Sequence, residues 1–249
     1  MMQDKNKKKK TIIILITLFL LLILITGLTC VLLYNGVIHI NNPAKSKYPI
    51  RGVDVSHYQG EIDWKQLAKE DIRFAYIKAT EGSGHKDEQF DKNWNEAQTT
   101  GLRIGAYHFF SLDSSGIGQA ENFCGTVEAV EDMLPPVVDV EPYGQYKDPD
   151  KLDKEKMLAE LGDYLEYIEN NYSMKPVIYT TEEWLPVLQE EFDDYDLWIR
   201  KVYDKPDASI NWTFWQYSNR HVLKGYSGAE RYIDMNVFSG DEQEFHDYR

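Results

Sequence analysis

Residues 11–34 form a run of 24 positions without a charged side chain, TIIILITLFLLLILITGLTCVLLY. About 20 apolar residues are enough for a helix to cross the hydrocarbon core of a bilayer. The ten residues before the run carry five lysines and one aspartate, and a lysine-rich flank stays on the cytoplasmic side. The sequence therefore predicts a single-pass protein of the cell membrane, with a cytoplasmic basic tail (1–10), one transmembrane helix (11–34) and an extracellular remainder.

Two kinds of export signal are alternatives to a permanent anchor. A cleaved signal peptide usually has an apolar core of about 7 to 15 residues followed by a small-residue cleavage site, and neither property fits this run. A lipoprotein signal would end at Cys30, but the preceding Gly27, Leu28 and Thr29 match that pattern poorly. We therefore expect the anchor to remain uncleaved.

The chain beyond the basic tail is strongly acidic. Removing the tail's five lysines and one aspartate from 27 basic and 41 acidic residues leaves 22 against 40, a formal charge of −18. A negative field of this size argues against nucleic acid as a partner. Of the two cysteines, Cys30 lies in the apolar run, so Cys124 has no disulfide partner in the exported part. The stability must therefore come from a packed core.

The exported part alternates short apolar runs with amphipathic segments. Residues 35–47 are polar and resemble a linker, although an edge segment packed on the domain is the alternative. We expect the folded domain to span residues 48–249. The predicted strands within it are 51–55, 74–79, 103–109, 137–141, 176–179, 196–200, 212–217 and 232–234.

Eight strands interleaved with helices in about 200 residues predict an α/β fold, a closed and mostly parallel (β/α) barrel of the TIM type. A doubly wound open sheet is the alternative. The connections 201–211 and 218–231 are too short for full helices, so we expect the barrel to be irregular.

The predicted strand 137–141 carries two carboxylates in an otherwise apolar run, Val-Val-Asp-Val-Glu. Side chains two apart on a strand point to the same face, so Asp139 and Glu141 should lie side by side. Burying two acids together is costly unless they share a proton, find donors or meet a cation. An ion-paired structural role is one interpretation of this pair, and an acid–base pair is the other.

Active sites of such barrels lie at the C-terminal ends of the strands. Asp54, Asp139, Glu141 and Asp234 should therefore converge on one pocket. No pattern of His and Cys indicates a metal site, although four acids leave an oxygen-only Mg²⁺ or Ca²⁺ site as an alternative. The chain has no G-x-S-x-G, P-loop or G-x-G-x-x-G motif, which argues against a serine nucleophile and nucleotide chemistry, and we expect no cofactor.

Aromatic residues gather near the same strand ends. They are Tyr58, Tyr107, Phe109, Phe110, Tyr179, Trp198, Trp215 and Tyr217. Core packing accounts for any single ring, but flat rings beside paired acids favour a groove for polysaccharide. Two neighbouring carboxyls with unequal protonation are the arrangement that glycoside hydrolysis uses.

Six motifs, in this order, resemble the glycoside hydrolase family 25 lysozymes. They are RGVDVSHYQG (51–60), AYIKATEG (75–82), GAYHF (105–109), VDVE (138–141), WQY (215–217) and YIDMN (232–236). The resemblance implies an irregular β/α barrel that cleaves the β-1,4 bond between N-acetylmuramic acid and N-acetylglucosamine in peptidoglycan.

The motif match also implies roles for individual residues. Glu141 is the expected general acid and Asp139 the second catalytic carboxylate, while Asp54 and Asp234 position or tune them. The expected substrate contacts are Glu81, Tyr107, Tyr179, Trp215 and Gln216.

The spacing of the two catalytic acids leaves the stereochemical outcome open. Residues two apart on a strand have backbones about 6.5 to 7 Å apart, and rotamers can close or widen the gap between their carboxyls. Because both acids rise from one side of the cleft, we favour substrate assistance. In this mechanism the 2-acetamido oxygen of the substrate is the nucleophile. Asp139 stabilises the positive charge that develops on the acetamido nitrogen, and Glu141 protonates the leaving oxygen.

A sugar-binding or scaffolding barrel with little turnover is the competing function, because it would keep the same motifs. The membrane helix is not a general feature of these lysozymes, and we expect it to hold the domain at the inner side of the wall. Such placement would suit local opening of the wall, for instance for a secretion or conjugation apparatus.

Overall fold

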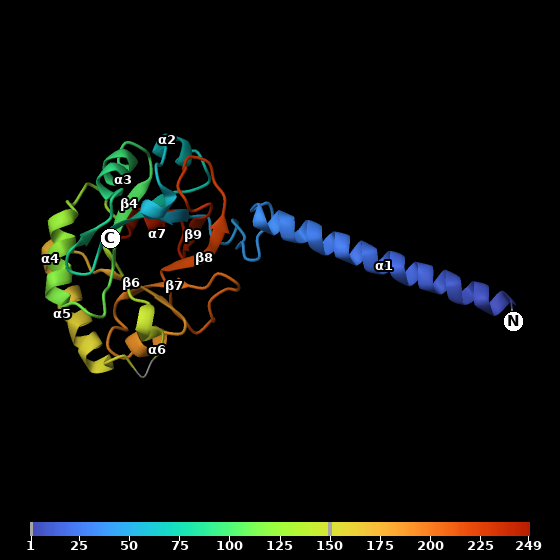
Figure 1. Cartoon of the computed structure of the whole chain (residues 1–249). Coiled ribbons are helices and arrows are strands. Elements are labelled where there is room, and N and C mark those ends of the chain that lie inside the picture. Colours follow the sequence, from blue (N-terminus) through green and yellow to red (C-terminus); the bar gives the residue numbers. More distant parts are fainter. Residues whose placement is uncertain (1, 149–150) are drawn as a thin grey trace. The chain divides into compact units, whose positions relative to one another are not determined.

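The computed structural model describes residues 2–148 and 151–249, with side chains from residue 6 onward. The chain separates into two compact units, and the boundary between them in the sequence lies between Ile40 and Asn41. The first unit is dominated by α1 (Met2–Tyr34), the long helix in Figure 1. Its segment Asn6–Tyr34 contains an 18-residue stretch with a mean hydropathy of 3.0 and is long and apolar enough to cross a membrane. A secretion signal near an N-terminus meets the same criteria.

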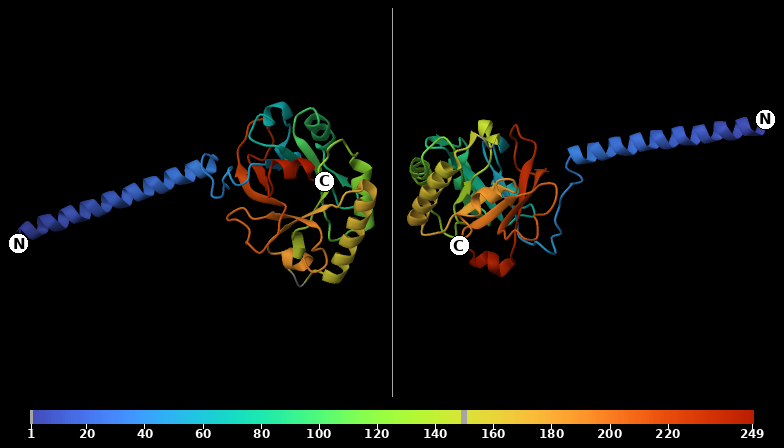
Figure 2. Two further views of the ribbon diagram at one scale, coloured as in Figure 1. Left: turned by 180° about the vertical axis from the view of Figure 1, so that it is seen from behind. Right: turned by 90° about the horizontal axis from the view of Figure 1, so that it is seen from below.

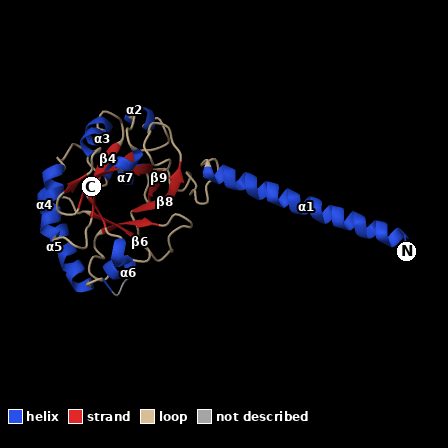
Figure 3. Ribbon diagram, in the orientation of Figure 1, coloured by secondary structure: helices blue, strands red, loops and turns tan. Residues whose placement is uncertain are grey.

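The second unit contains the predicted closed barrel (Figure 3). The barrel strands are β1 (Arg51–Val55), β2 (Phe74–Glu81), β4 (Arg103–Phe109), β5 (Val137–Asp139), β6 (Val177–Thr181), β7 (Asp196–Arg200), β8 (Phe214–His221) and β9 (Ile233–Phe238). They pair in this order, and the pairings of β1 with β2 and with β9 close the ring. The short strand β3 (His85–Lys86) pairs with β2 outside the ring.

Strand β9 runs against the direction of the others. The pairings from β1 through β8 are parallel, whereas β9 is antiparallel to both β8 and β1. The sequence placed Asp234 at the end of a strand 232–234, but it lies near the start of β9. Because β9 is reversed, its start lies at the same rim as the C-terminal ends of the parallel strands.

Helices pack around the ring, and in Figure 3 all of them except the last, near the C-terminus, lie outside the strands. They are α2 (Trp64–Leu67), α3 (Phe90–Ala97), α4 (Gly116–Thr126), α5 (Lys154–Tyr172), α6 (Leu185–Leu188) and α7 (Glu242–Asp247). The longest, α5, begins after Asp153, whose carboxylate accepts a hydrogen bond from the backbone N–H of Lys156. Its buried residues Leu161, Leu165 and Ile168 recur at spacings of three and four and form the apolar face that packs on the barrel domain.

Aromatic rings fill the interior of the barrel. The centroids of Tyr76 and Trp198 lie 4.9 Å apart, and those of Phe74 and Phe214 lie 5.3 Å apart. Phe245 of α7 packs on Phe74 at 5.7 Å, so α7 covers one end of the ring (Figure 2). The opposite end, where the polar inward-facing residues lie, remains open.

Two inward-facing glycines make room for these rings. A Cβ atom on Gly52 would lie 2.4 Å from the ring of Phe74, and one on Gly105 would lie 2.2 Å from the ring of Tyr76. Such distances are far below ordinary carbon–carbon contact, so any larger residue would displace an aromatic ring of the core.

The compact unit begins earlier than the predicted boundary at residue 48. Asn41 donates hydrogen bonds to backbone carbonyls of the barrel domain, and Asn42 accepts one from Arg51. Residues 41–47 therefore belong to the folded unit, as in the packed-segment alternative, and residues 35–40 connect it to α1.

Candidate active site

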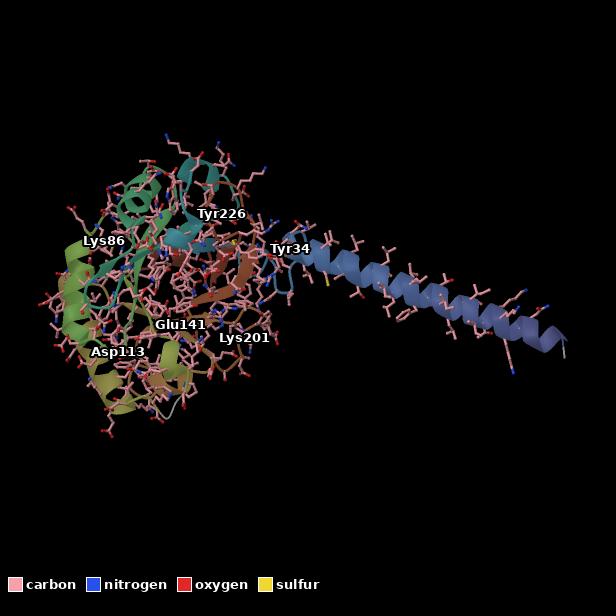
Figure 4. The ribbon with its side chains drawn as sticks, viewed as in Figure 1. Tyr34, Lys86, Asp113, Glu141, Lys201 and Tyr226 are labelled. Carbon is pink, nitrogen blue, oxygen red and sulfur yellow. The ribbon has the colours of Figure 1, made fainter. Side chains whose placement is uncertain are left out.

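A cleft of about 660 Å³ opens at the rim formed by the C-terminal ends of the parallel strands and the start of β9. Figure 4 labels Glu141 in the middle of the barrel domain. The polar and aromatic residues lining the cleft include Asp54, Tyr58, Lys78, Glu81, Tyr107, Phe109, Asp139, Glu141, Tyr143, Tyr179, Trp198, Arg200, Gln216, Arg220, Tyr232 and Asp234. All four predicted carboxylates are therefore brought together.

Asp139, the last residue of β5, and Glu141, two residues beyond it, lie on one side of the cleft; the observed strand is thus shorter than the predicted strand 137–141. The backbone carbonyl of Asp139 accepts a hydrogen bond from Phe110 N–H at 2.9 Å. The next residue, Val140, is held by a bond from its N–H to the carbonyl of Tyr179, also 2.9 Å, so the extended backbone continues past the last strand residue. Alternation along this backbone then directs both carboxyls into the cleft, as predicted from their spacing.

One carboxyl oxygen of Asp139 accepts no hydrogen bond from the described residues. Its Oδ1 atom is buried and has no hydrogen-bond partner among the residues that the structure describes. A buried acceptor without a partner costs free energy, and such atoms in a cleft are natural contacts for a ligand. This oxygen can accept an N–H or O–H from a bound molecule.

The pKa values of Asp139 and Glu141 are both raised. Burial raises the pKa of Asp139 well above its usual range, and the charge of Glu141 raises it further. Burial also raises the pKa of Glu141, while the positive charge of Arg200 opposes that rise. The pair therefore holds a proton more readily than two exposed carboxyls would, as general acid catalysis requires.

The second pair of acids is held by amides. Gln216 Nε2 donates to Oδ2 of Asp54 at 3.0 Å and to Oδ2 of Asp234 at 3.3 Å. Asn236 Nδ2 donates to the same oxygen of Asp54 at 2.8 Å, and its own oxygen accepts from Trp198 Nε1 at 2.9 Å. These contacts fix the carboxylates at the floor of the cleft.

Burial is also the main cause of the raised pKa values of Asp54 and Asp234. It raises the pKa of Asp54, although the donors Asn236 and Gln216 oppose the rise. It raises the pKa of Asp234 well above its usual range, and the neighbouring charge of Asp54 adds to the effect. The pKa values of Asp54, Asp139, Glu141 and Asp234 are thus all raised.

Four of the five predicted substrate contacts line the cleft: Glu81, Tyr107, Tyr179 and Gln216. Tyr179 donates its hydroxyl hydrogen to Gln216 Oε1 at 3.0 Å, which links it to the second pair of acids. Glu81 accepts from the buried ammonium of Lys78 at 2.7 Å. The structure brings these residues together.

Trp215 does not line the cleft. It is 1% exposed in the apolar layer outside the barrel, and its Nε1 donates to the backbone carbonyl of Lys201 at 2.9 Å. Adjacent residues of a strand point to opposite faces, so Gln216 facing inward sends Trp215 outward. The assignment of Trp215 as a substrate contact is therefore not supported by its position.

Sequence reasoning placed Lys78 and Arg200 at strand ends but gave them no role in the site, and it missed the support that Asn236 provides. Lys78 and Arg200 are cations among the acids, and Asn236 supports Asp54 from inside the barrel. Each lies two positions from another inward-facing residue, since Tyr76, Trp198 and Asp234 precede them by two. Strand alternation was the signal that could have identified them.

One cluster of three metal-type ligands lies close together within the described residues: His57, Asp87 and Glu88. The buried carboxylate of Asp87 already accepts three N–H bonds, from the backbone and Nδ1 of His57 and from the backbone of Gln89. These hydrogen bonds account for the cluster, because they hold the segment at His57 against the segment that contains Asp87 and Gln89. The expectation of no metal in the cleft remains a prediction.

Comparison with known proteins decides the family. The sequence pattern of glycosyl hydrolases family 25 matches residues 53–226, more than half of the chain. The chain belongs to this family. A family 25 glycosyl hydrolase from Bacillus anthracis is 46% identical and superimposes with a TM-score of 0.78, covering 84% of this chain and 97% of that one.

Two relatives extend the comparison. An uncharacterized protein, YegX, from Escherichia coli O157:H7 is 37% identical over 215 residues, which cover 83% of this chain and 74% of that protein. Lysozyme M1 of Streptomyces globisporus is 32% identical over 203 residues, covering 77% of this chain and 68% of that protein. The protein is thus a glycoside hydrolase of family 25, and the predicted barrel is confirmed.

Proposed function

We propose that this family 25 glycoside hydrolase is an N-acetylmuramidase that cleaves the β-1,4 bond between N-acetylmuramic acid and N-acetylglucosamine in peptidoglycan. The observation that carries the proposal is the convergence of Asp54, Asp139, Glu141 and Asp234 in one cleft. Its similarity to a lysozyme supports the choice of substrate.

Glu141 is the general acid in this proposal. Burial raises its pKa, so the carboxyl keeps a proton that it can deliver to the leaving glycosidic oxygen. Glu141 follows the end of β5 and is more accessible than a side chain deeper in the barrel, so it can reach a glycan lying across the rim. The cleft is open on that side, which suits a polymer rather than a small molecule.

Asp139 acts on the substrate's acetamido group. Its unpartnered Oδ1 accepts the acetamido N–H, and this bond favours the carboxylate form of Asp139. The proton that Asp139 and Glu141 share then resides on Glu141. Once the acetamido oxygen has attacked the anomeric carbon, the Asp139 carboxylate stabilises the positive charge on the ring that forms.

The second pair of acids supplies negative potential beneath the sugar. Asp54 and Asp234 are fixed by Gln216, so they need no rearrangement when positive charge develops at the anomeric carbon. Tyr179 orients Gln216 through its hydroxyl. Tyr107 lines the same wall and is placed to contact the glycan.

Wall digestion by the Glu141→Gln variant tests the proposal. The variant keeps the shape of the side chain but removes the transferable proton, so cleavage by the full chain in detergent should fall by about 10²- to 10⁴-fold. Glu121→Gln, at an exposed position on α4, is the matched control and should retain activity. Mass analysis of released muropeptides should show muramic acid at the new reducing end. Equal activity in the Glu141→Gln variant would instead favour the glycan-binding or scaffolding barrel.

The anomeric form of the product tests substrate assistance. Attack by the acetamido oxygen followed by water gives net retention of configuration. A glycan whose muramic acid lacks the acetyl group should then resist cleavage, because the attacking oxygen is absent. Net inversion at the anomeric carbon would rule out this role for Asp139.

Helix α1 is proposed to anchor the enzyme in the cell membrane, with the lysine-rich end in the cytoplasm and the catalytic domain outside. The expectation is that the full chain sediments with membranes and that removal of residues 1–40 releases it. Recovery of wild-type protein in the soluble fraction with a new N-terminus after residue 34 would show that the helix is a cleaved signal. Service to a secretion or conjugation apparatus remains a prediction from the sequence.

A further inference from the structure

Asn41 makes a hydrogen-bonded junction with strand β8 and with the segment that follows strand β7. Its Nδ2 atom lies 3.0 Å from the backbone carbonyl oxygen of Asp204, 3.1 Å from that of Tyr217 and 3.4 Å from that of Lys201. Only a donor can face three carbonyl oxygens, so the orientation of the amide is fixed by its surroundings. Its two N–H hydrogens are shared among the three carbonyls, and the contact with Lys201 is the longest and weakest.

Two of the three carbonyls that Asn41 contacts lie one residue beyond a cleft side chain. Lys201 follows Arg200 at the end of β7, and Tyr217 follows Gln216 in β8. Arg200 and Gln216 are direct partners in the pairing of these strands. The last backbone bond of the pairing runs from Lys201 N–H to the carbonyl of Gln216, at 3.0 Å. Figure 4 labels Lys201 at the margin of the barrel domain.

The barrel needs support at this point because its ladder is interrupted there. The pairing of β8 with β9 shifts register between Gln216 and Ser218, which leaves Tyr217 at an irregularity. A strand loses part of its regular pairing at such a bulge. Asn41 supplies a donor to the carbonyl of Tyr217, and Trp215 supplies a second donor to the carbonyl of Lys201.

The segment that carries Asn41 is itself held on the domain. Arg51 NH1 donates to Asn42 Oδ1 at 3.1 Å, and Arg51 NH2 donates to the carbonyl of Pro43. The ring of Tyr48 packs against Trp215 with centroids 6.0 Å apart. Residues 41–48 thus form a strap across the outer side of the β7–β8 pairing.

We propose that Asn41 is a positioning residue for the active site. It holds the segment that follows β7 against the middle of β8 at Tyr217, and through this contact it positions the side chain of Gln216, which binds Asp54 and Asp234. This inference rests on the proposed function, because it assigns Asn41 a share in the geometry of that cleft. The segment that follows the membrane helix is accordingly part of the catalytic apparatus.

The test compares Asn41→Ala with Ser46→Ala, an exposed position on the same strap, in the full chain. Loss of one well-placed hydrogen bond lowers an equilibrium or a rate by about threefold to tenfold, so we expect kcat on purified walls to fall in that range with KM unchanged. Asn41→Asp places a carboxylate against the carbonyls and should lower kcat further. Ser46→Ala should match the wild type.

Two measurements separate positioning from general destabilisation. In a Gln216→Ala background, Asn41→Ala should reduce kcat by less than twofold, because its route to the acids is already cut. An undiminished effect of Asn41→Ala in that background overturns the inference. Glu141→Gln is included in the same assay, and a wild type no faster than Glu141→Gln marks failure of the proposed function instead.

Hydrogen exchange tests the junction without reference to activity. The amide of Lys201, bonded to Gln216, should exchange faster in Asn41→Ala than in the wild type or Ser46→Ala. Unchanged exchange at this amide would show that Asn41 does not hold the strands together, whatever the kinetics.

Discussion

Asp54 and Asp234 are direct partners across the antiparallel pairing of β1 and β9. The two acids are 180 positions apart in the sequence, yet one amide group, that of Gln216, donates to both. Closure of the barrel creates this pair, because β9 must return beside β1 in the reverse direction to place Asp234 at the rim. The following predictions depend on this arrangement and on the aromatic interior beneath it.

Replacing Gln216 by Glu should nearly abolish activity. The change keeps the size of the side chain but removes both N–H donors and adds a carboxylate between Asp54 and Asp234. Loss of preorganised donors at a reacting centre costs about 10²- to 10³-fold in kcat. Wall digestion measures the effect, with Gln189→Glu at an exposed position as the control. Retention of more than a tenth of the wild-type kcat would contradict the proposed role of Gln216.

The stability of the catalytic domain should depend on pH through its buried acids. Burial raises the folded-state pKa of Asp139, so its stabilising contribution is complete below its unfolded pKa, about 4, and is lost as pH rises through the folded value. Asp139→Asn removes that dependence. The variant should therefore unfold at a higher temperature than the wild type at pH 7, and the two midpoints should approach each other toward pH 4.

Near-ultraviolet circular dichroism follows this transition through the aromatic core. Asp113→Asn, at an exposed position, is the matched control and should leave the difference between pH 7 and pH 4 close to that of the wild type. A variant Asp139→Asn that is less stable than the wild type at neutral pH would mean that Asp139 is stabilised as a carboxylate by the fold.

Tyr179→Phe and Trp215→Phe should separate catalysis from stability. Tyr179→Phe removes the hydroxyl bond to Gln216, so kcat should fall by about tenfold while the free energy of unfolding changes by about 1 kcal/mol. Trp215→Phe changes no residue that lines the cleft but removes the donor to Lys201, so the free energy of unfolding should fall by about 1 to 3 kcal/mol while KM stays unchanged and kcat falls no further than in Asn41→Ala. Kinetics on walls and thermal unfolding together distinguish the two. A change in KM in Trp215→Phe without loss of stability would restore Trp215 as a substrate contact.

Gly105→Ala should destabilise the barrel. The added Cβ would lie 2.2 Å from a ring carbon of Tyr76, and overpacking of a filled core costs about 1 to 3 kcal/mol or more. Gly101→Ala is the control, because a Cβ at that position meets no atom within 4 Å. The comparison requires only thermal or denaturant unfolding of the two variants. Equal stability would show that the aromatic interior can rearrange.

Local sequence determined much of this protein. The alternation of side chains along a strand places Asp139 and Glu141 on one face, whatever surrounds them. The charge-free run 11–34 predicts a helix, which α1 confirms, and the bounds of β1, β4 and β7 match the predicted strands to the residue. These features depend on neighbours within a few positions, so the sequence alone carries them.

Tertiary structure decided the rest. The reversal of β9, the outward position of Trp215 and the docking of Asn41 all follow from which distant segments pair when the ring closes. A strand segment does not encode its partner, its direction or the face that meets the core, because these depend on contacts far along the chain. The sequence was therefore enough to identify the four acids, whereas only the closed barrel places Asp54 and Asp234 where the amide of Gln216 can donate to both.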